Sequence, residues 1–252
     1  MIRRVVCALA LVASASPAAA QNTILFFPRF DFHLGADHLS IGDPRFVWDT
    51  NFGGDMDFVD YGLGRMTFEA NYEAVLGEQF HRFDPNQGTY LLDLSTSVRG
   101  RGVEVAALFH HTSRHLSDRF KRDPLDWNML GARVGHDLRR GSMQVRAQGD
   151  LLGTLLKSNV DYRWEANGSV QVRVPVRPRI SAIAEGRTRL VGVDGSRRRG
   201  TQRGARGEAG LRFEGQGGAI ELIVAAERRI DAYPLEMSAM SWLSAGFRFV
   251  SR

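Results

Sequence analysis

The chain has 252 residues, a formal net charge of +5 and a single cysteine, Cys7. Its 33 Lys and Arg residues exceed the 28 Asp and Glu residues only modestly. This balance does not by itself indicate a nucleic-acid partner, and none is expected. The lack of cysteine after residue 7 excludes a disulfide or a thiolate nucleophile from the rest of the chain.

The first twenty residues have the pattern of a secretory signal peptide. Arg3 and Arg4 precede a short apolar run, and Ala20 ends the A-x-A pattern that signal peptidase cleaves. This run is too short to span a membrane as a helix, and no later segment approaches the ~20 apolar residues that such a helix needs. We therefore predict export, with residues 1–20 removed and residues 21–252 forming one all-β domain.

The following segments alternate apolar and polar residues with a period of two, which is typical of strands with two different environments. Two upstream segments, 29–39 and 45–52, can be drawn as strands. Ten further segments of about ten residues follow, and they predict about twelve strands, with about ten as the alternative count. The connections between these segments alternate between short and long. The long ones are expected at residues 76–88, 114–125, 157–167, 191–203 and 230–240.

Short turns alternating with long loops indicate a transmembrane antiparallel β-barrel, because only a closed barrel satisfies the backbone of strands in lipid. The polar faces of the strands carry charges of both signs. Wide channels need roughly 16 strands, so we expect a lumen filled by ion pairs, and a narrow channel is the alternative. The predicted charged lumen positions are Arg65, Glu69, Glu73, Asp93, Glu104, Arg133, Arg146, Asp150, Glu185, Arg187, Arg206, Glu208, Arg212, Glu221 and Arg248.

The segment GVEVAALFHHTS carries the candidate chemistry. Continuing the parity of its apolar residues places His111 and Ser113 on the lipid face, whereas His110 points to the lumen and His115 falls in a loop. On the following strand, Asn128 shares the lipid-facing parity. Because serine becomes a nucleophile when a histidine accepts its proton, these residues are catalytic candidates. Asn128 or an acid among Asp118, Asp123 and Asp126 could orient the imidazole.

This order, His-x-Ser followed by a polar residue on the next strand, resembles the motif of outer-membrane phospholipase A and of the lipid A deacylases. The resemblance implies acyl-ester hydrolysis by Ser113, His111 and Asn128, and only in this case would calcium be a possible cofactor. No other cofactor is expected. The sequence departs from the phospholipase pattern at Arg114, where that family has an Asn-Gly pair, and in the later position of Asn128. The alternative is that these are ordinary amphipathic residues at a lipid–water boundary.

The loop GVDGSRRRGTQRGAR, residues 192–206, is basic. Arginine binds phosphate in bidentate geometry, so this loop is a candidate for binding lipopolysaccharide or another anionic surface. The favoured interpretation of the loop is nevertheless an ordinary solvated loop. The candidate residues are Arg197, Arg198, Arg199 and Arg203.

The last segment, WLSAGFRFVSR, resembles the closing strand of bacterial outer-membrane barrels, which implies that Phe249 lies at the periplasmic edge. The segments DPRFVWDTNF, FHHTSRHLSDRF and VDYRWE resemble an uncharacterised family of such barrels. This resemblance implies an outer-membrane location in a Gram-negative-type bacterium, contact with membrane lipids and insertion by the barrel-assembly machinery. It implies no activity and leaves the oligomeric state open. We therefore predict a barrel with a structural or surface-binding role, with a lipid esterase as the alternative.

Overall fold

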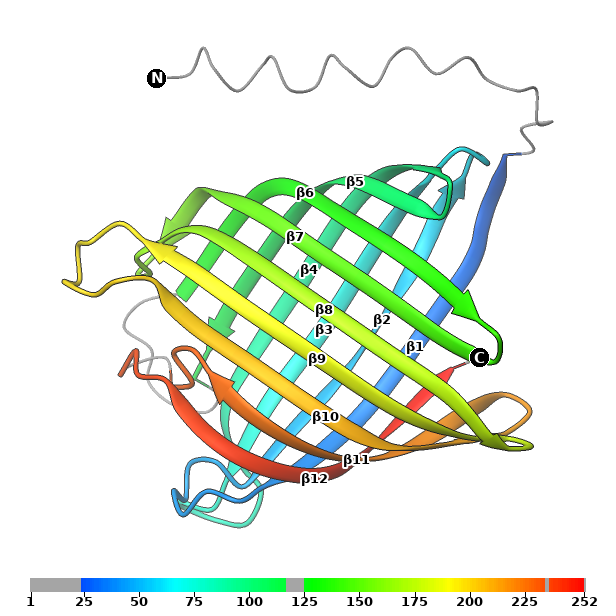
Figure 1. The fold of residues 1–252 in the computed structure, drawn as a ribbon. Helices are drawn as coiled ribbons and strands as arrows, with labels where there is room; N and C mark the ends of the chain where they lie inside the picture. Colours follow the sequence, from blue (N-terminus) through cyan, green and yellow to red (C-terminus); the bar gives the residue numbers. More distant parts are fainter. Residues whose placement is uncertain (1–23, 117–124, 234–235, 252) are drawn as a thin grey trace, which may run out of the picture.

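The structure is a computed structural model that describes residues 24–116, 125–233 and 236–251. The predicted signal peptide, residues 1–20, lies outside these ranges. Twelve antiparallel strands form a closed barrel, in which β1 pairs with β12 (Figure 1). Their bounds are β1 Leu25–Leu39, β2 Trp48–Asp60, β3 Arg65–Gly77, β4 Asp84–Gly100, β5 Val103–His115, β6 Leu125–Arg140, β7 Met143–Ser158, β8 Tyr162–Arg177, β9 Ile180–Val193, β10 Gln202–Glu214, β11 Gly218–Arg229 and β12 Met240–Ser251.

The predicted twelve-stranded barrel is confirmed, but the strands are longer than the sequence pattern indicated. β1 starts at Leu25 and β2 extends to Asp60. The predicted long loop 157–167 was wrong, because β7 continues to Ser158 and β8 begins at Tyr162. Backbone groups at strand ends pair with neighbouring strands even where the side chains no longer alternate, so the strands outlast their pattern. β12 runs antiparallel to β1 and ends beside Phe32 and His33, so the first residues of β1 extend beyond it on the side expected to be periplasmic.

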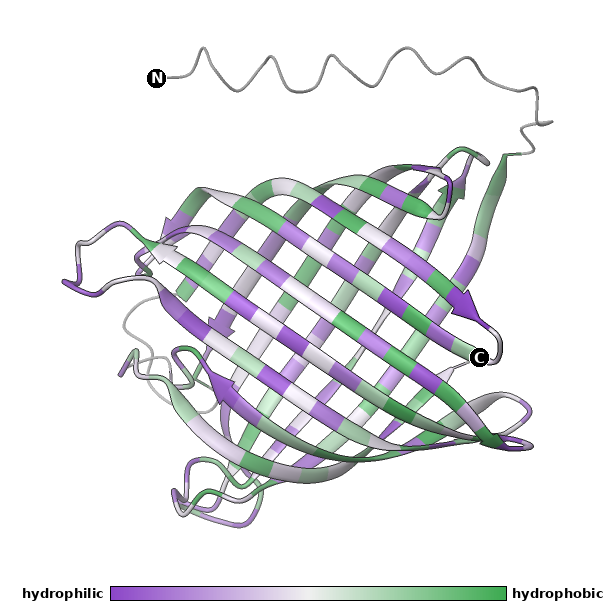
Figure 2. Cartoon of the chain, in the orientation of Figure 1, coloured by the Kyte–Doolittle hydropathy of each residue, from purple (hydrophilic) through white to green (hydrophobic). Residues whose placement is uncertain are grey.

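The outer surface of the barrel is apolar along most of its height. Figure 2 shows the alternation of hydrophobic and hydrophilic residues along the strands. Exposed side chains such as Leu151, Val224 and Leu243 are more than 60% accessible, and in a membrane they would face lipid. Separately, the described part of the chain contains no helix that is long and apolar enough to cross a membrane.

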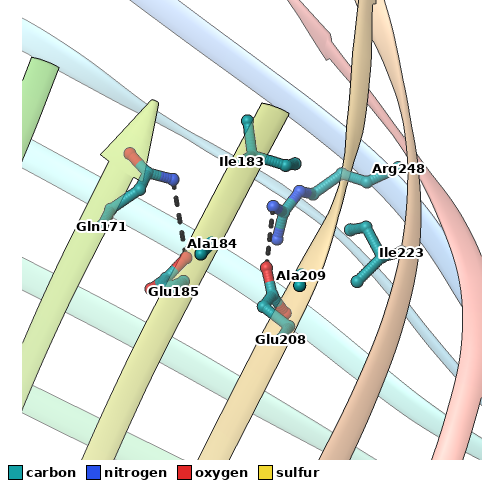
Figure 3. A pocket seen from close by; sticks show the side chains of 8 residues that line it. All are labelled: Gln171, Ile183, Ala184, Glu185, Glu208, Ala209, Ile223 and Arg248. Carbon is teal, nitrogen blue, oxygen red and sulfur yellow. Dashed lines mark hydrogen bonds and ion pairs between the residues drawn. The ribbon is translucent and has the colours of Figure 1, made fainter. Parts of the chain in front are cut away.

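A network of ion pairs lies inside the lumen, as predicted. Arg133 donates to Asp150 at 2.9 Å and to Asp93 at 2.9 Å. Arg248 bridges Glu208 at 3.0 Å and Glu221 at 2.7 Å. Figure 3 shows Arg248 of β12 reaching Glu208 of β10, with Gln171 and Glu185 nearby. Buried charges are tolerated only when paired in this way, so the network fills the barrel with matched charges.

A plug of buried residues lies at the extracellular end of the lumen and includes the start of the β11–β12 connection. Trp127, Met129 and Tyr162 belong to one buried cluster, which also contacts Ile230 from the β11–β12 connection. The neighbouring residue Asp231 is buried as well and accepts a hydrogen bond from the Tyr162 hydroxyl at 2.7 Å. Residues 230–233, at the start of this connection, are therefore packed into the barrel.

Candidate active site at the extracellular rim

The β5–β6 hairpin places His111 and Asn128 directly opposite each other near the extracellular rim. The ring nitrogen Nδ1 of His111 lies 2.9 Å from the amide oxygen Oδ1 of Asn128. Because an amide oxygen can only accept, Nδ1 carries the proton and donates it to Asn128. In the neutral ring this leaves the Nε2 lone pair of His111 as a proton acceptor. The structure thus brings together two of the three residues predicted from the sequence.

The third predicted residue, Ser113, lies on the same outward face of β5, but its hydroxyl bonds to a different histidine. Ser113 Oγ is 2.7 Å from Nε2 of His115. The prediction that His115 belongs to a loop was wrong, because β5 stays paired with β4 as far as the register pair of Gly88 and His115. Strand pairing therefore gives His115 the same outward parity as Ser113 and His111.

Aromatic rings extend the site across β3 and β4. The Tyr90 side chain, directly opposite Ser113, packs edge-on against His115 with ring centres 5.6 Å apart. Tyr72 in turn contacts Tyr90 at 4.7 Å. Such amphipathic rings are typical of the lipid–water boundary. In a membrane this row is expected at the headgroup level, and Ser113 lies opposite Tyr90 within it.

The two histidines differ in their distance from the bilayer. His111 is the nearer to the membrane: its neighbours across the strands are Leu92 and Asn128, and Phe109 follows on its own face. His115 ends β5 and lies on the water side of Ser113. Asp126, one of the predicted orienting acids, lies opposite Ser113. Two further candidate acids, Asp118 and Asp123, lie outside the described residues.

A second histidine chain, which the sequence analysis did not single out, occupies the lumen behind this site. His110 Nδ1 lies 2.6 Å from Asp93 Oδ1, and His110 Nε2 lies 2.8 Å from the Thr112 hydroxyl. The lumen parity of His110, Thr112 and Asp93 was the sequence signal that could have revealed it. Thr112 is only 2% exposed, so this Asp–His–Thr chain has no access to lipid and is a structural network.

The basic loop does not present all four of its candidate arginines to the outside. Arg199 turns inward and pairs with Asp161 at 2.5 Å and Asp231 at 2.6 Å, so its guanidinium already has two acidic partners. The carboxylates of Asp161 and Asp231 are buried, so they need a nearby cation to offset the loss of their hydration. Arg197 donates to the Asn159 carbonyl at 2.7 Å. Arg198 and Arg203 are exposed, and neither has an acidic partner among the described residues.

The contacts between Arg199 and Asp231 shift the pKa values of both side chains. Burial alone would raise the pKa of Asp231, but hydrogen bonds from Arg199 and Tyr162 outweigh burial and hold the pKa below its ordinary value. The pKa of Arg199 is raised, first by its hydrogen bond to Asp161. Asp231 is therefore an anion throughout the physiological range and is paired with Arg199. In the part of the chain that the structure describes, no cluster of three His, Cys, Asp or Glu side chains is spaced to hold a metal ion.

No family model and no curated protein matches the chain. Among solved structures, outer membrane phospholipase A from Escherichia coli matches with a TM-score of 0.54 at 11% identity, covering 90% of this chain and 94% of that one. An asparagine-to-alanine active-site mutant of that phospholipase matches with a TM-score of 0.55 at 11% identity, covering 93% of this chain and 95% of that one. The outer membrane phospholipase of Salmonella typhi, solved as a dimer with bound calcium, matches with a TM-score of 0.54 at 11% identity, covering 91% of this chain and 92% of that one.

The chain is an outer-membrane β-barrel. At these identities the likeness to the phospholipases is one of fold alone. The barrel, its outward apolar surface and its filled lumen together place the protein in the outer membrane, and its lipids surround it. At the rim of β5 and β6, the Ser113 hydroxyl bonds to the imidazole of His115, and the His111 imidazole bonds to the Asn128 amide.

Proposed function

We propose that this outer-membrane barrel is a lipid acyl-ester hydrolase, with Ser113 as the nucleophile and the His111–Asn128 pair as part of its catalytic site. The observation that carries the proposal is the hydroxyl of Ser113 bonded to an imidazole, at 2.7 Å, on the lipid-facing side of the rim. A serine becomes nucleophilic when a base accepts its proton, and this contact supplies one.

The position of the site favours a membrane lipid as the substrate. The ester groups of lipids lie just beneath the headgroups, at the level marked by Tyr72 and Tyr90. The acyl chains below that level would run along the exposed side chains of Phe109, Leu130 and Leu156. A water-soluble substrate would have no use for this apolar surface.

The hydrogen bond from His111 to Asn128 adds support. A side chain that fixes the tautomer of a histidine leaves its other nitrogen ready to act as a base. The similar fold of a phospholipase whose active-site mutant replaces an asparagine is consistent with this role for Asn128. Calcium would be relevant only to this proposed activity.

The test is hydrolysis of phospholipid and of lipid A by the detergent-solubilised barrel, whose folding is shown by heat-modifiable gel migration. We expect release of fatty acid by the wild type and its loss in Ser113→Ala. Ser241→Ala is a matched control, because Ser241 is an exposed residue at the same rim on β12. We expect His111→Ala to lose about a hundredfold or more, as for removal of a general base, and His38→Ala on β1 to retain activity. A folded wild type without activity on either lipid contradicts the proposal.

A surface-binding role is the second candidate, and one observation favours it: Arg198 and Arg203 stay exposed without an acidic partner in the described ranges. Guanidinium groups in this state can bind the phosphates of lipopolysaccharide. We expect the double variant Arg198→Gln, Arg203→Gln to weaken lipopolysaccharide binding in a salt-dependent way. Equal binding by the variant and the wild type argues against this role.

A further inference from the structure

The hydrogen bond between Ser113 and His115 was not predicted from the sequence. Ser113 lies between His111 and His115 along β5, each two residues away and on the same face of the strand. His111 bonds to Asn128. The serine hydroxyl bonds to His115.

We propose that His115 is a further catalytic residue, the base that takes the proton of Ser113, and that Tyr90 is its positioning residue. This inference rests on the proposed hydrolase function. The contact of 2.7 Å is within the range over which a general base abstracts a proton. The edge of Tyr90, 5.6 Å away between ring centres, restricts the imidazole on its β4 side.

The location of His115 suits this task better than that of His111. His115 ends β5 on the water side of Ser113, where an imidazolium ion remains partly hydrated. His111 lies one step closer to the bilayer, beside Leu92, where a positive charge costs more. With His115 serving Ser113, the Nε2 lone pair of His111 can act as the base for the water that later releases the acyl group.

The chemistry balances with water as the only co-reactant. The O–H bond of Ser113 breaks, its proton moves to Nε2 of His115, and Oγ forms a bond to the ester carbonyl carbon. The lipid alcohol then leaves with the proton from His115, which gives an acyl-serine. Water attacks the acyl-serine, an imidazole takes its proton, and the fatty acid departs as Ser113 regains a proton.

The test exploits the absence of cysteine beyond Cys7. In a Ser113→Cys variant expressed without the first twenty residues and refolded into detergent, the new thiol is the sole thiol. Its alkylation rate by iodoacetamide as a function of pH then gives its pKa. A thiol paired with an imidazole ionises well below the ordinary value of about 8.5. This measurement requires no substrate, so it remains informative even if the hydrolase activity fails.

We expect Ser113→Cys to show a lowered thiol pKa, Ser113→Cys with His115→Gln to return toward about 8.5, and Ser113→Cys with His111→Gln to stay low. The groups that face this thiol from the described strands are Tyr90 on β4, His111 and His115 on β5, and Asp126 on β6. All three variants retain Tyr90 and Asp126, so only the imidazoles differ. Restoration of the ordinary value by His111→Gln alone, or by neither histidine change, overturns the assignment.

Activity provides the second readout. With Ser113 intact, His115→Gln should lower kcat about a hundredfold with little change in KM, and His38→Gln should not. If the wild type hydrolyses lipid and His115→Gln hydrolyses it equally well, His115 is not the base, although the hydrolase proposal stands. If the wild type is inactive but the thiol of Ser113→Cys is still paired with His115, the geometry holds and the proposed function is wrong.

Discussion

His111 and Asn128 face each other across the β5–β6 hairpin, with Nδ1 of the ring 2.9 Å from the amide oxygen. The amide oxygen selects one tautomer of the ring and fixes its orientation. Strand register creates this contact, since the two residues are 17 positions apart in the chain.

Removal of the amide should therefore misorient His111 without disturbing the barrel. We expect Asn128→Ala to lower the rate of lipid hydrolysis about tenfold, the equivalent of one hydrogen bond of about 1.4 kcal/mol. The measurement compares kcat of folded Asn128→Ala and wild-type protein on the same phospholipid. Unchanged kcat would remove Asn128 from the site.

The ion pairs that hold the plug should contribute strongly to stability. Arg199 is shared by Asp161 and Asp231, whose side chains are 0% and 3% exposed. Arg199→Gln leaves two buried carboxylates without their cation, and we expect a loss of about 3–5 kcal/mol in the free energy of unfolding. Urea unfolding followed by tryptophan fluorescence measures this loss.

The neighbouring Arg198 is a matched control, because it is exposed and has no acidic partner among the described residues. Arg198→Gln should change the free energy of unfolding by less than about 0.5 kcal/mol. Similar losses in the two variants would show that the pairing with Asp161 and Asp231 does not stabilise the plug.

The lowered pKa of Asp231 makes the stability of the plug depend on pH. A carboxyl group whose pKa is lower in the folded state contributes stability above its unfolded pKa, about 3.9 for Asp, and loses it as the pH falls through the folded value. The wild type should therefore lose thermal stability in acid below about pH 4. Asp231→Asn should show a smaller decrease over the same range, measured as the unfolding temperature between acid and neutral pH.

The filled lumen should prevent steady ion conduction. Ion pairs such as Arg133 with Asp150 occupy the lumen, and Trp127 and Tyr162 pack in the plug at its extracellular end. We expect planar bilayers containing the folded barrel to show no stable single-channel steps. Reproducible steps at neutral pH would favour the narrow-channel alternative and would require a rearrangement of the plug.

The alternation of residues along the chain determined the barrel, its twelve strands and the faces of His110, His111, Ser113 and Asn128. Successive side chains of a strand point to opposite faces, so a period of two in the sequence shows which residues share a face without a structure. The same rule predicted the charged lumen. It failed where pairing, and not pattern, decides: β7 and β8 continue through the expected loop 157–167.

Only the tertiary structure decided which of these residues meet. The register between β5 and β6 placed His111 opposite Asn128, and the pairing of β5 with β4 kept His115 in the strand beside Ser113. The inward turn of Arg199 depends on Asp161 and Asp231, which are 38 and 32 residues away. A linear pattern shows which way a side chain points, but register and loop packing between distant segments decide what it touches.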